Sequence, residues 1–263
     1  MNNNLPQRTD GETYGKYLGW IAGLALLMAL SSAYAASSDE IQVYDDAINK
    51  PGELSVDMHL NYVVSGVRQS SYPKEIPSNH DFRMTPEFAY GIDPNWEGGL
   101  YLPAIRSADG NWYAEGLKFR MKYIGTHDEI GPYWGVNGEL GYSSHRTEEH
   151  NWNFELRPII GYRTEAWAFA LNPILGFPIS GNDHTSSFSP GMKVGRKISQ
   201  DTWLNLENYS DFGMLDNLRS RVQETYLTVD TEVLGHELNF GVGHGWTHES
   251  NDTTIKAIIS LPL

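Results

Sequence analysis

Apolar and polar side chains alternate one by one in residues 53–64, which read ELSVDMHLNYVV. The apolar positions share one face of an extended chain, and they are Leu54, Val56, Met58, Leu60 and Tyr62. The polar positions share the opposite face, and they are Ser55, Asp57, His59 and Asn61. Because successive side chains of a β-strand point to opposite sides, this period of two predicts a strand with one apolar and one polar face.

The same alternation recurs to the end of the chain, and no window carries the apolar stripe of an amphipathic helix. The runs are about ten residues long, which is the length that a tilted strand needs to cross a bilayer. They cover residues 53–64, 82–90, 96–104, 112–123, 133–142, 152–162, 167–177, 188–198, 202–210, 225–233, 237–246 and 253–263. The sequence therefore predicts an all-β chain, a transmembrane antiparallel up-and-down β-barrel of about twelve strands. The alternation is least regular over 188–233, where a smaller barrel of about ten strands is the alternative.

The connections between the runs differ in length at the two ends. Long polar loops are expected at 65–81, 180–187 and 211–221, whereas 93–95 and 163–165 read as tight turns. Long loops at one end and short turns at the other are typical of outer-membrane barrels. The connection at 125–130 is somewhat long for a short turn.

The first 35 residues read as an export signal. Residues 18–30, LGWIAGLALLMAL, are too short to cross a hydrocarbon core of ~30 Å, and small residues precede a cleavage point after Ala35. A membrane anchor is the alternative, and the leader is unusual because its acidic residues balance its basic ones. We expect a signal peptide over 1–35, a periplasmic N-terminal segment over 36–51 and the barrel over 52–263.

Alternation alone does not separate a membrane barrel from a soluble β-protein. Trp and Tyr side chains cluster near the ends of the runs, as they do in the girdles of membrane barrels. The polar face also carries many charges, which are costly in a dry core but can pair or hydrate in a lumen. A formal net charge of −14 argues against a nucleic-acid partner, and the absence of cysteine removes disulfides and thiol chemistry.

Candidate lumen-facing residues follow from the parity of each run. They are Asp57, His59, Arg83, Glu87, Lys118, Arg120, Lys122, Glu139, Glu155, Arg157, Lys193 and Lys256. Lys118, Arg120 and Lys122 form a basic ladder along one strand, for which two interpretations stay open. In a conducting pore the ladder favours anions, and in a filled barrel it pairs with carboxylates such as Glu87, Glu139 and Glu155. Twelve strands lie between filled eight-stranded barrels and open porins, and the large inward side chains favour a narrow lumen whose roomiest wall is the glycine-rich run 237–246.

Several short pieces of the chain resemble a proteobacterial family of outer-membrane barrels. They are residues 39–44 (DEIQVY), 48–53 (INKPGE), 85–91 (TPEFAYG), 99–103 (GLYLP), 155–162 (ELRPIIGY) and 172–176 (NPILG). The family is known as putative meta-pathway phenol-degradation or transporter proteins, and the likeness spans essentially the whole mature chain. The resemblance implies an outer-membrane location and passage of a small solute, for which an aromatic or hydrophobic compound is the expectation, and it brings no catalytic residues.

These patterns predict a non-enzymatic barrel in the cell outer membrane that passes a small solute passively, without a cofactor. The expected partners are outer-membrane lipid, lipopolysaccharide, the barrel-assembly machinery and a small-molecule solute. The alternative is a structural or interaction barrel with an occluded lumen and displayed loops.

A lipid hydrolase is the third hypothesis. Its candidate residues are the pairs His184 with Ser186 and His248 with Ser250, all of which fall in expected loops. Residues 145–150, HRTEEH, contain two histidines but do not match the spacing of a helical zinc motif, so a solvated loop is expected there.

Overall fold

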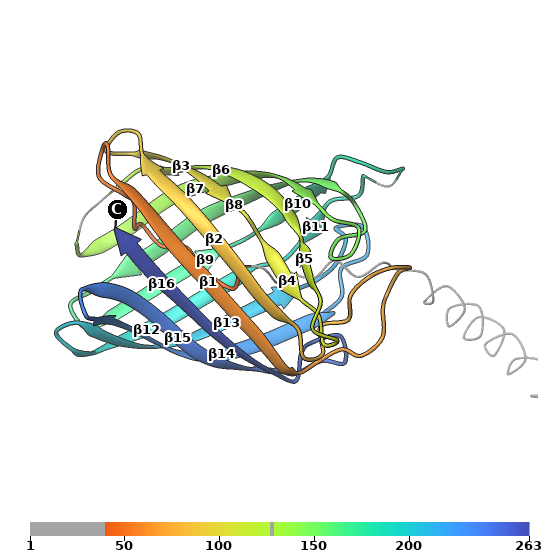
Figure 1. Cartoon of the computed structure of the whole chain (residues 1–263). Helices are drawn as coiled ribbons and strands as arrows, with labels where there is room; N and C mark the ends of the chain where they lie inside the picture. Colours follow the sequence, from red (N-terminus) through yellow and green to blue (C-terminus); the bar gives the residue numbers. More distant parts are fainter. Residues whose placement is uncertain (1–39, 127–128, 183, 263) are drawn as a thin grey trace, which may run out of the picture. The chain divides into compact units, whose positions relative to one another are not determined.

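The computed structural model describes residues 40–126, 129–182 and 184–262, with the side chain of residue 262 excepted (Figure 1). Within these residues the secondary structure is entirely β, and no helix is long and apolar enough to cross a membrane. The strands are β1 (Leu54–Ser65), β2 (Phe82–Gly91), β3 (Trp96–Tyr101), β4 (Ala104–Arg106), β5 (Trp112–Ala114), β6 (Gly116–Ile124), β7 (Gly131–Ser143), β8 (Trp152–Arg163), β9 (Trp167–Asn172), β10 (Leu175–Pro178), β11 (Ser187–Phe188), β12 (Gly191–Ser199), β13 (Thr202–Asp211), β14 (Val222–Val233), β15 (His236–Gly245) and β16 (Thr253–Pro262).

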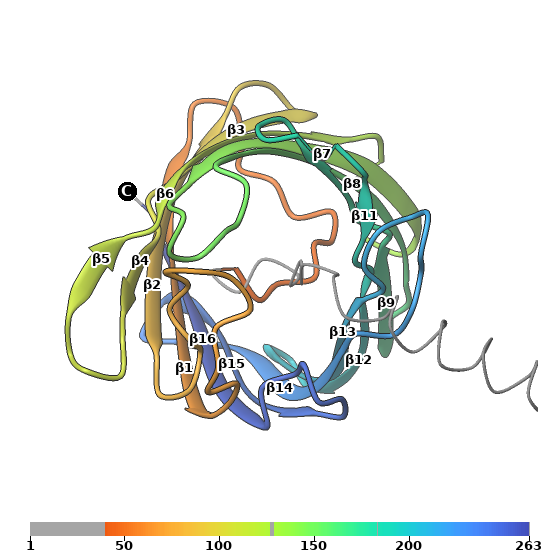
Figure 2. The same cartoon turned by 90° about the vertical axis from the view of Figure 1, so that its right-hand side faces the viewer.

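The strands form one closed antiparallel barrel. Sequence neighbours pair around the wall, and β1 closes it by pairing with both β2 and β16. Figure 2 shows the resulting ring of strands seen from one end. Four of the twelve barrel strands are interrupted and appear as two segments each, which are β3 with β4, β5 with β6, β9 with β10, and β11 with β12. The predicted up-and-down barrel of twelve strands is confirmed, including the irregular region 188–233.

Three of the four interruptions contain a proline. Pro103 separates β3 from β4, Pro173 separates β9 from β10, and Pro190 separates β11 from β12. Proline has no N–H group to donate to the sheet, so the ladder breaks where it occurs. The alternating pattern continues through these positions, which is why the sequence predicted unbroken strands there.

The two faces of the wall have opposite character. On β6, Phe119 and Met121 are exposed on the outside, whereas Arg120 and Lys122 are buried on the inside. Leu206 on β13 and Leu227 on the adjacent β14 are also more than half exposed, at 54% and 57%. A soluble protein would place these side chains in its core, so the apolar outer face requires an apolar surrounding.

Aromatic rings gather near both ends of the barrel. Near the short turns, the ring of Tyr123 lies 4.9 Å from that of Trp96 and 5.7 Å from that of Trp134. Near the long loops, the rings of Tyr142 and Trp152 lie 5.4 Å apart. Amphipathic rings favour the boundary between hydrocarbon and headgroups, so the two groups are placed as interfacial girdles.

The segment before β1 runs inside the barrel. Residues 36–51 were expected to be a periplasmic segment. Residues 40–48 lie inside the ring of strands (Figure 2). The segment runs from Arg157, which Glu40 contacts, to the short-turn end, where the N–H of Asn49 donates to Glu97. A segment without alternation carries no local signal of what it packs against, so the sequence alone does not predict these contacts with the wall. The expected signal peptide, 1–35, lies outside the described residues.

The glycine-rich strand β15 is not the open wall that the sequence predicted. A Cβ atom at Gly243 would lie 2.3 Å from the ring of Tyr226, and one at Gly241 would lie 2.4 Å from the side chain of Thr228. Side chains of β14 therefore fill the room that these glycines leave.

Candidate functional site

A stretch of the chain itself, residues 40–48, occupies the interior of the barrel. Val43 packs in a cluster on one side of the lumen with Ala170, Tyr209 and Tyr226. Tyr44 packs in a cluster on the other side with Ile124, Tyr133 and Ile159. Residues 40–48, all of which are described, belong to no strand, so wall side chains rather than a β-ladder hold them.

Asn172 at the end of β9 binds the backbone of this segment. The N–H of Tyr44 donates to Asn172 Oδ1 at 2.6 Å, and Asn172 Nδ2 donates to the carbonyl of Tyr44 at 3.0 Å. The side-chain amide thus replaces the pair of bonds that a neighbouring strand would make. Because Asn172 and the backbone of Tyr44 are buried, neither has water as an alternative partner.

Three carboxylates of the segment pair with cations of the wall. Glu40 lies 3.2 Å from the guanidinium of Arg157. Asp45 lies 3.4 Å from the ammonium of Lys193. Asp46 forms an ion pair with Arg163 at the short-turn end of β8. The segment therefore enters the lumen as an acidic strip that neutralises three basic wall residues.

The predicted basic ladder is neutralised in part by carboxylates of the wall. Arg120 pairs with Glu87 and with Glu97, the latter at 2.7 Å, and Lys122 lies 3.0 Å from Glu97. His59 lies 3.1 Å from the other oxygen of Glu87. Lys118 lies on the same face of β6, beside Gly141 of β7. These contacts fit the filled interpretation of the ladder better than the anion-conducting one.

The other candidates from the sequence fall into separate groups. Arg157 lies 2.8 Å from Glu155 and 3.9 Å from Glu139, so these three come together around the segment. Lys256 lies 2.6 Å from Glu207 and donates to the carbonyl of Ile41.

The last two candidates are Arg83 and Asp57. Arg83 lies near the long loops, where it pairs with Asp81 and Glu115. Burial raises the pKa of Asp81, and the charge of Arg83 opposes that shift. Asp57 is half-buried on the inner face of β1, opposite Glu87 of β2, so it adjoins the group of Glu87, His59 and Arg120.

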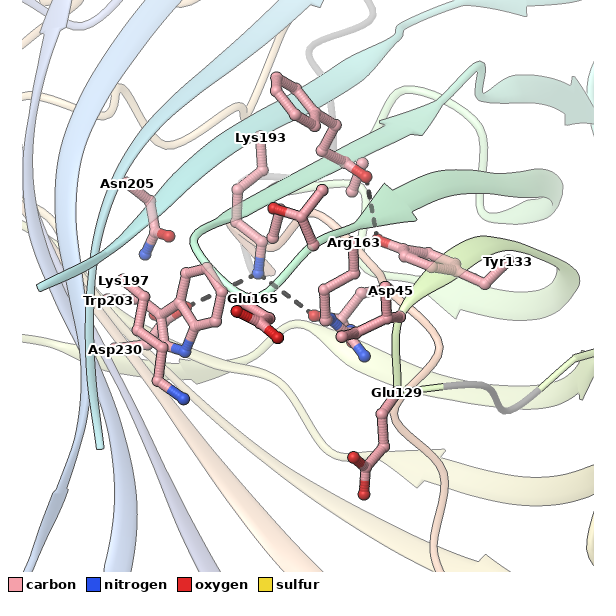
Figure 3. Close-up of a pocket in the computed structure, with 15 residues that line it drawn as sticks. Asp45, Glu129, Tyr133, Arg163, Glu165, Lys193, Lys197, Trp203, Asn205 and Asp230 are labelled. Atoms are coloured by element: carbon pink, nitrogen blue, oxygen red, sulfur yellow. Dashed lines mark hydrogen bonds and ion pairs between the residues drawn. The ribbon is translucent and has the colours of Figure 1, made fainter. Parts of the chain in front are cut away.

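A cavity of about 500 Å³ lies at the short-turn end, beyond the segment (Figure 3). Its lining combines charged side chains with Tyr133 and Trp203 and with the small residues Ala168 and Ala170. The charged residues are Asp45, Glu129, Arg163, Glu165, Lys193, Lys197 and Asp230. Of these, only Lys193 was among the candidates from the sequence.

Sequence reasoning missed the acidic residues of the segment and their basic partner Arg163. Glu40, Asp45 and Asp46 precede the first alternating run, so no periodicity assigns them to a face. Arg163 continues the inward parity of Arg157, which is the signal that could have found it.

The candidate enzyme and metal residues do not assemble into sites. His184 Nδ1 lies 3.0 Å from the carbonyl of Pro178, and Ser250 Oγ bonds with Thr247 and Gln223. The ring of His145 lies beside that of Tyr72, with 5.3 Å between centroids and an angle of 46° between the planes. Across the described ranges, no group of three or more His, Asp or Glu side chains has the arrangement of a metal site.

No family model and no curated protein matches the sequence. Solved structures share the fold. An outer-membrane channel from Pseudomonas putida F1 aligns with a TM-score of 0.64 at 12% identity, over 85% of this chain and 100% of that one. The KdgM porin in complex with disordered oligogalacturonate aligns at 0.52 and 10% identity, over 80% of this chain and 99% of that one. The NanC porin aligns at 0.50 and 10% identity, over 79% and 97% of the two chains. At these identities the likeness establishes the outer-membrane type of barrel fold.

Proposed function

We propose that this chain spans the outer membrane and lets a small solute pass passively through its lumen. The observation that carries the proposal is the occupant of the lumen. The space inside the wall holds a separate stretch of chain, residues 40–48, rather than being closed by wall side chains alone. A wall that accommodates a polypeptide segment encloses enough room for a small solute.

The membrane location rests on the inversion of the two faces. Exposed aliphatic and aromatic side chains cover the outside, and buried ion pairs such as those of Arg120 and Lys256 line the inside. Ion pairs of this kind are tolerated where they are hydrogen-bonded or hydrated, whereas the lipid face of a barrel excludes charge. The expected export signal agrees with this location, and contacts with lipid, lipopolysaccharide and the barrel-assembly machinery would follow from it.

Single-channel recording in planar bilayers tests the passage. We expect small ionic conductance from the full chain and a larger one from a variant that lacks residues 40–48. Swelling of liposomes in solutions of small neutral solutes supplies a second readout. If neither protein conducts and neither permits swelling, although both show the mobility of folded barrels on gels, the passage is refuted.

That outcome would favour a structural or interaction barrel with an occluded lumen. The ion pairs of Glu40, Asp45 and Asp46 with the wall are the observation that supports this second function. Its displayed surface would be the long loops that follow β1, β10 and β13.

The finer assignments rest on the resemblance of the sequence alone. Membership of the meta-pathway family and an aromatic or hydrophobic solute are proposals that uptake of labelled compounds would test. We propose no catalytic role, because one residue of each His–Ser pair in the hydrolase hypothesis, His184 and Ser250, bonds to another group. Lipid hydrolysis that collapsed on His184→Ala or His248→Ala would overturn this.

A further inference from the structure

Two cations at the short-turn end are positioned by the wall. The guanidinium carbon of Arg163 lies 5.3 Å from the centroid of the Tyr133 ring. Tyr133 is itself fixed, since its hydroxyl donates to the carbonyl of Phe169 at 3.1 Å and a Cβ at Gly161 would lie 2.0 Å from its ring. Lys193 lies 3.7 Å from Asp230 of β14. Both cations therefore keep wall neighbours that do not belong to the segment 40–48.

The segment supplies carboxylates to both cations from two consecutive residues. Asp45 reaches Lys193 of β12 (Figure 3). Asp46 reaches Arg163 of β8. One strand, β9, separates β8 from β12, and Arg163 and Lys193 pair with positions two residues apart on it, so the backbones of the two cations are about 12 Å apart. One short stretch that carries two carboxylates thus bridges two strands.

The same two cations border open space. Arg163, Lys193 and Asp45 all line the cavity of about 500 Å³, whose volume suits a small molecule. Ala168 and Ala170 form part of its wall and leave it wide, and Lys197 adds a third cation. The cavity lies beside the turns 125–130 and 164–166, through Glu129, Ile130, Thr164 and Glu165.

We propose that Arg163 and Lys193 form a binding site for a small solute that carries two or more carboxylates, and that Asp45 and Asp46 occupy this site in its absence. The inference rests on the proposed passage, because it names the class of solute that would use it. The acidic segment acts as an internal competitor. A solute carboxylate that replaces Asp45 or Asp46 restores the charge pairing that the departing aspartate gives up.

Calorimetric titration of the purified full chain with citrate, at fixed ionic strength, tests this site. We expect the double variant Asp45→Asn with Asp46→Asn to bind citrate about tenfold more tightly than the wild type, within the range usual for coupled binding. Adding Arg163→Gln and Lys193→Gln to that variant removes the binding. Acetate, with one carboxylate, binds more weakly than citrate because it engages one cation at a time.

Two matched variants separate the site from general effects of charge and folding. Asp201→Asn with Glu232→Gln removes the same charge from exposed positions outside the cavity, and citrate affinity stays at the wild-type value. Arg163→Lys keeps the cation, and citrate binding is retained.

Two results would overturn the proposal. One is citrate binding that survives loss of both cations, and the other is a variant without Asp45 and Asp46 that binds citrate no better than the wild type. Binding and passage are read separately. A chain that binds citrate but does not conduct refutes the passage alone, and one that conducts but does not bind citrate refutes the site alone.

Discussion

The two hydrogen bonds between Asn172 and Tyr44 can be removed by one substitution, Asn172→Ala. Each bond contributes about 1–1.5 kcal/mol, so the loss weakens attachment of the segment by about 2–3 kcal/mol. At tenfold per 1.4 kcal/mol, this raises the population with a released segment by about 30- to 150-fold. Both groups of Tyr44 are buried, so no water replaces the lost partner in the docked state.

The chain contains no cysteine, which allows a single reporter thiol. Val43→Cys places the thiol at a position that is 3% exposed and packed against the wall. When docking and release are fast relative to labelling, the rate of reaction with a maleimide follows the population with the segment released. Asn172→Ala should then raise the labelling rate by the same factor.

A second buried asparagine serves as the control. Asn205 on β13 is 2% exposed and bonds with Thr228 of the wall. Asn205→Ala should leave the labelling rate of the thiol at residue 43 near that of the parent. An unchanged rate in Asn172→Ala refutes the reasoning, and so does an equal rise in both variants, since that would reflect general loosening of the barrel.

Three further substitutions test the inner face of the wall, its outer face and the turn between β14 and β15. Lys256→Met leaves the buried charge of Glu207 uncompensated and should lower the free energy of unfolding by about 3–5 kcal/mol, measured by urea titration in liposomes. Adding Glu207→Leu should restore much of this free energy. An unchanged free energy of unfolding in the single variant contradicts the pairing. Phe119→Lys places a charge on the lipid face and should cost about 2–4 kcal/mol in the same titration, whereas little cost would indicate a wet outer surface. Leu234→Asn should raise the free energy of unfolding by about 1 kcal/mol, because Leu234 has a φ of 56°, which Asn adopts at lower cost, and is 96% exposed. Leu218→Asn is the control, since Leu218 is exposed in a loop without a positive φ, and it should leave the free energy of unfolding unchanged.

The strands of the wall could be predicted because their signal is local. The alternation of Leu54, Met58 and Tyr62 with Asp57 and His59 reports directly which side of the wall each residue occupies. The prolines that interrupt three strands do not disturb this parity, so the count of twelve survived them. The sequence of each strand therefore shows by itself which side chains face lipid and which face the lumen.

The interior could be predicted only in part. Parity identified Arg120, Arg157 and Lys256 as candidates, but their partners depend on strand register and on residues far along the chain. Glu40 lies 117 residues from Arg157, and nothing in the sequence near either residue records that contact. The placement of residues 40–48 is a property of the closed barrel, which exists only after distant strands have paired.

The contrast between how the wall and the segment are held bears on function. Backbone ladders close the wall on every side, whereas side chains such as Asn172, Arg163 and Lys193 hold residues 40–48. Releasing the segment therefore breaks no ladder bond and leaves the barrel closed. Its cost is the sum of side-chain hydrogen bonds, ion pairs and the apolar contacts of Val43 and Tyr44. A charged solute would replace the ion pairs one by one. A lumen filled in this way can be stable at rest and still exchange its contents, which a lumen filled by wall side chains cannot do without distorting the wall.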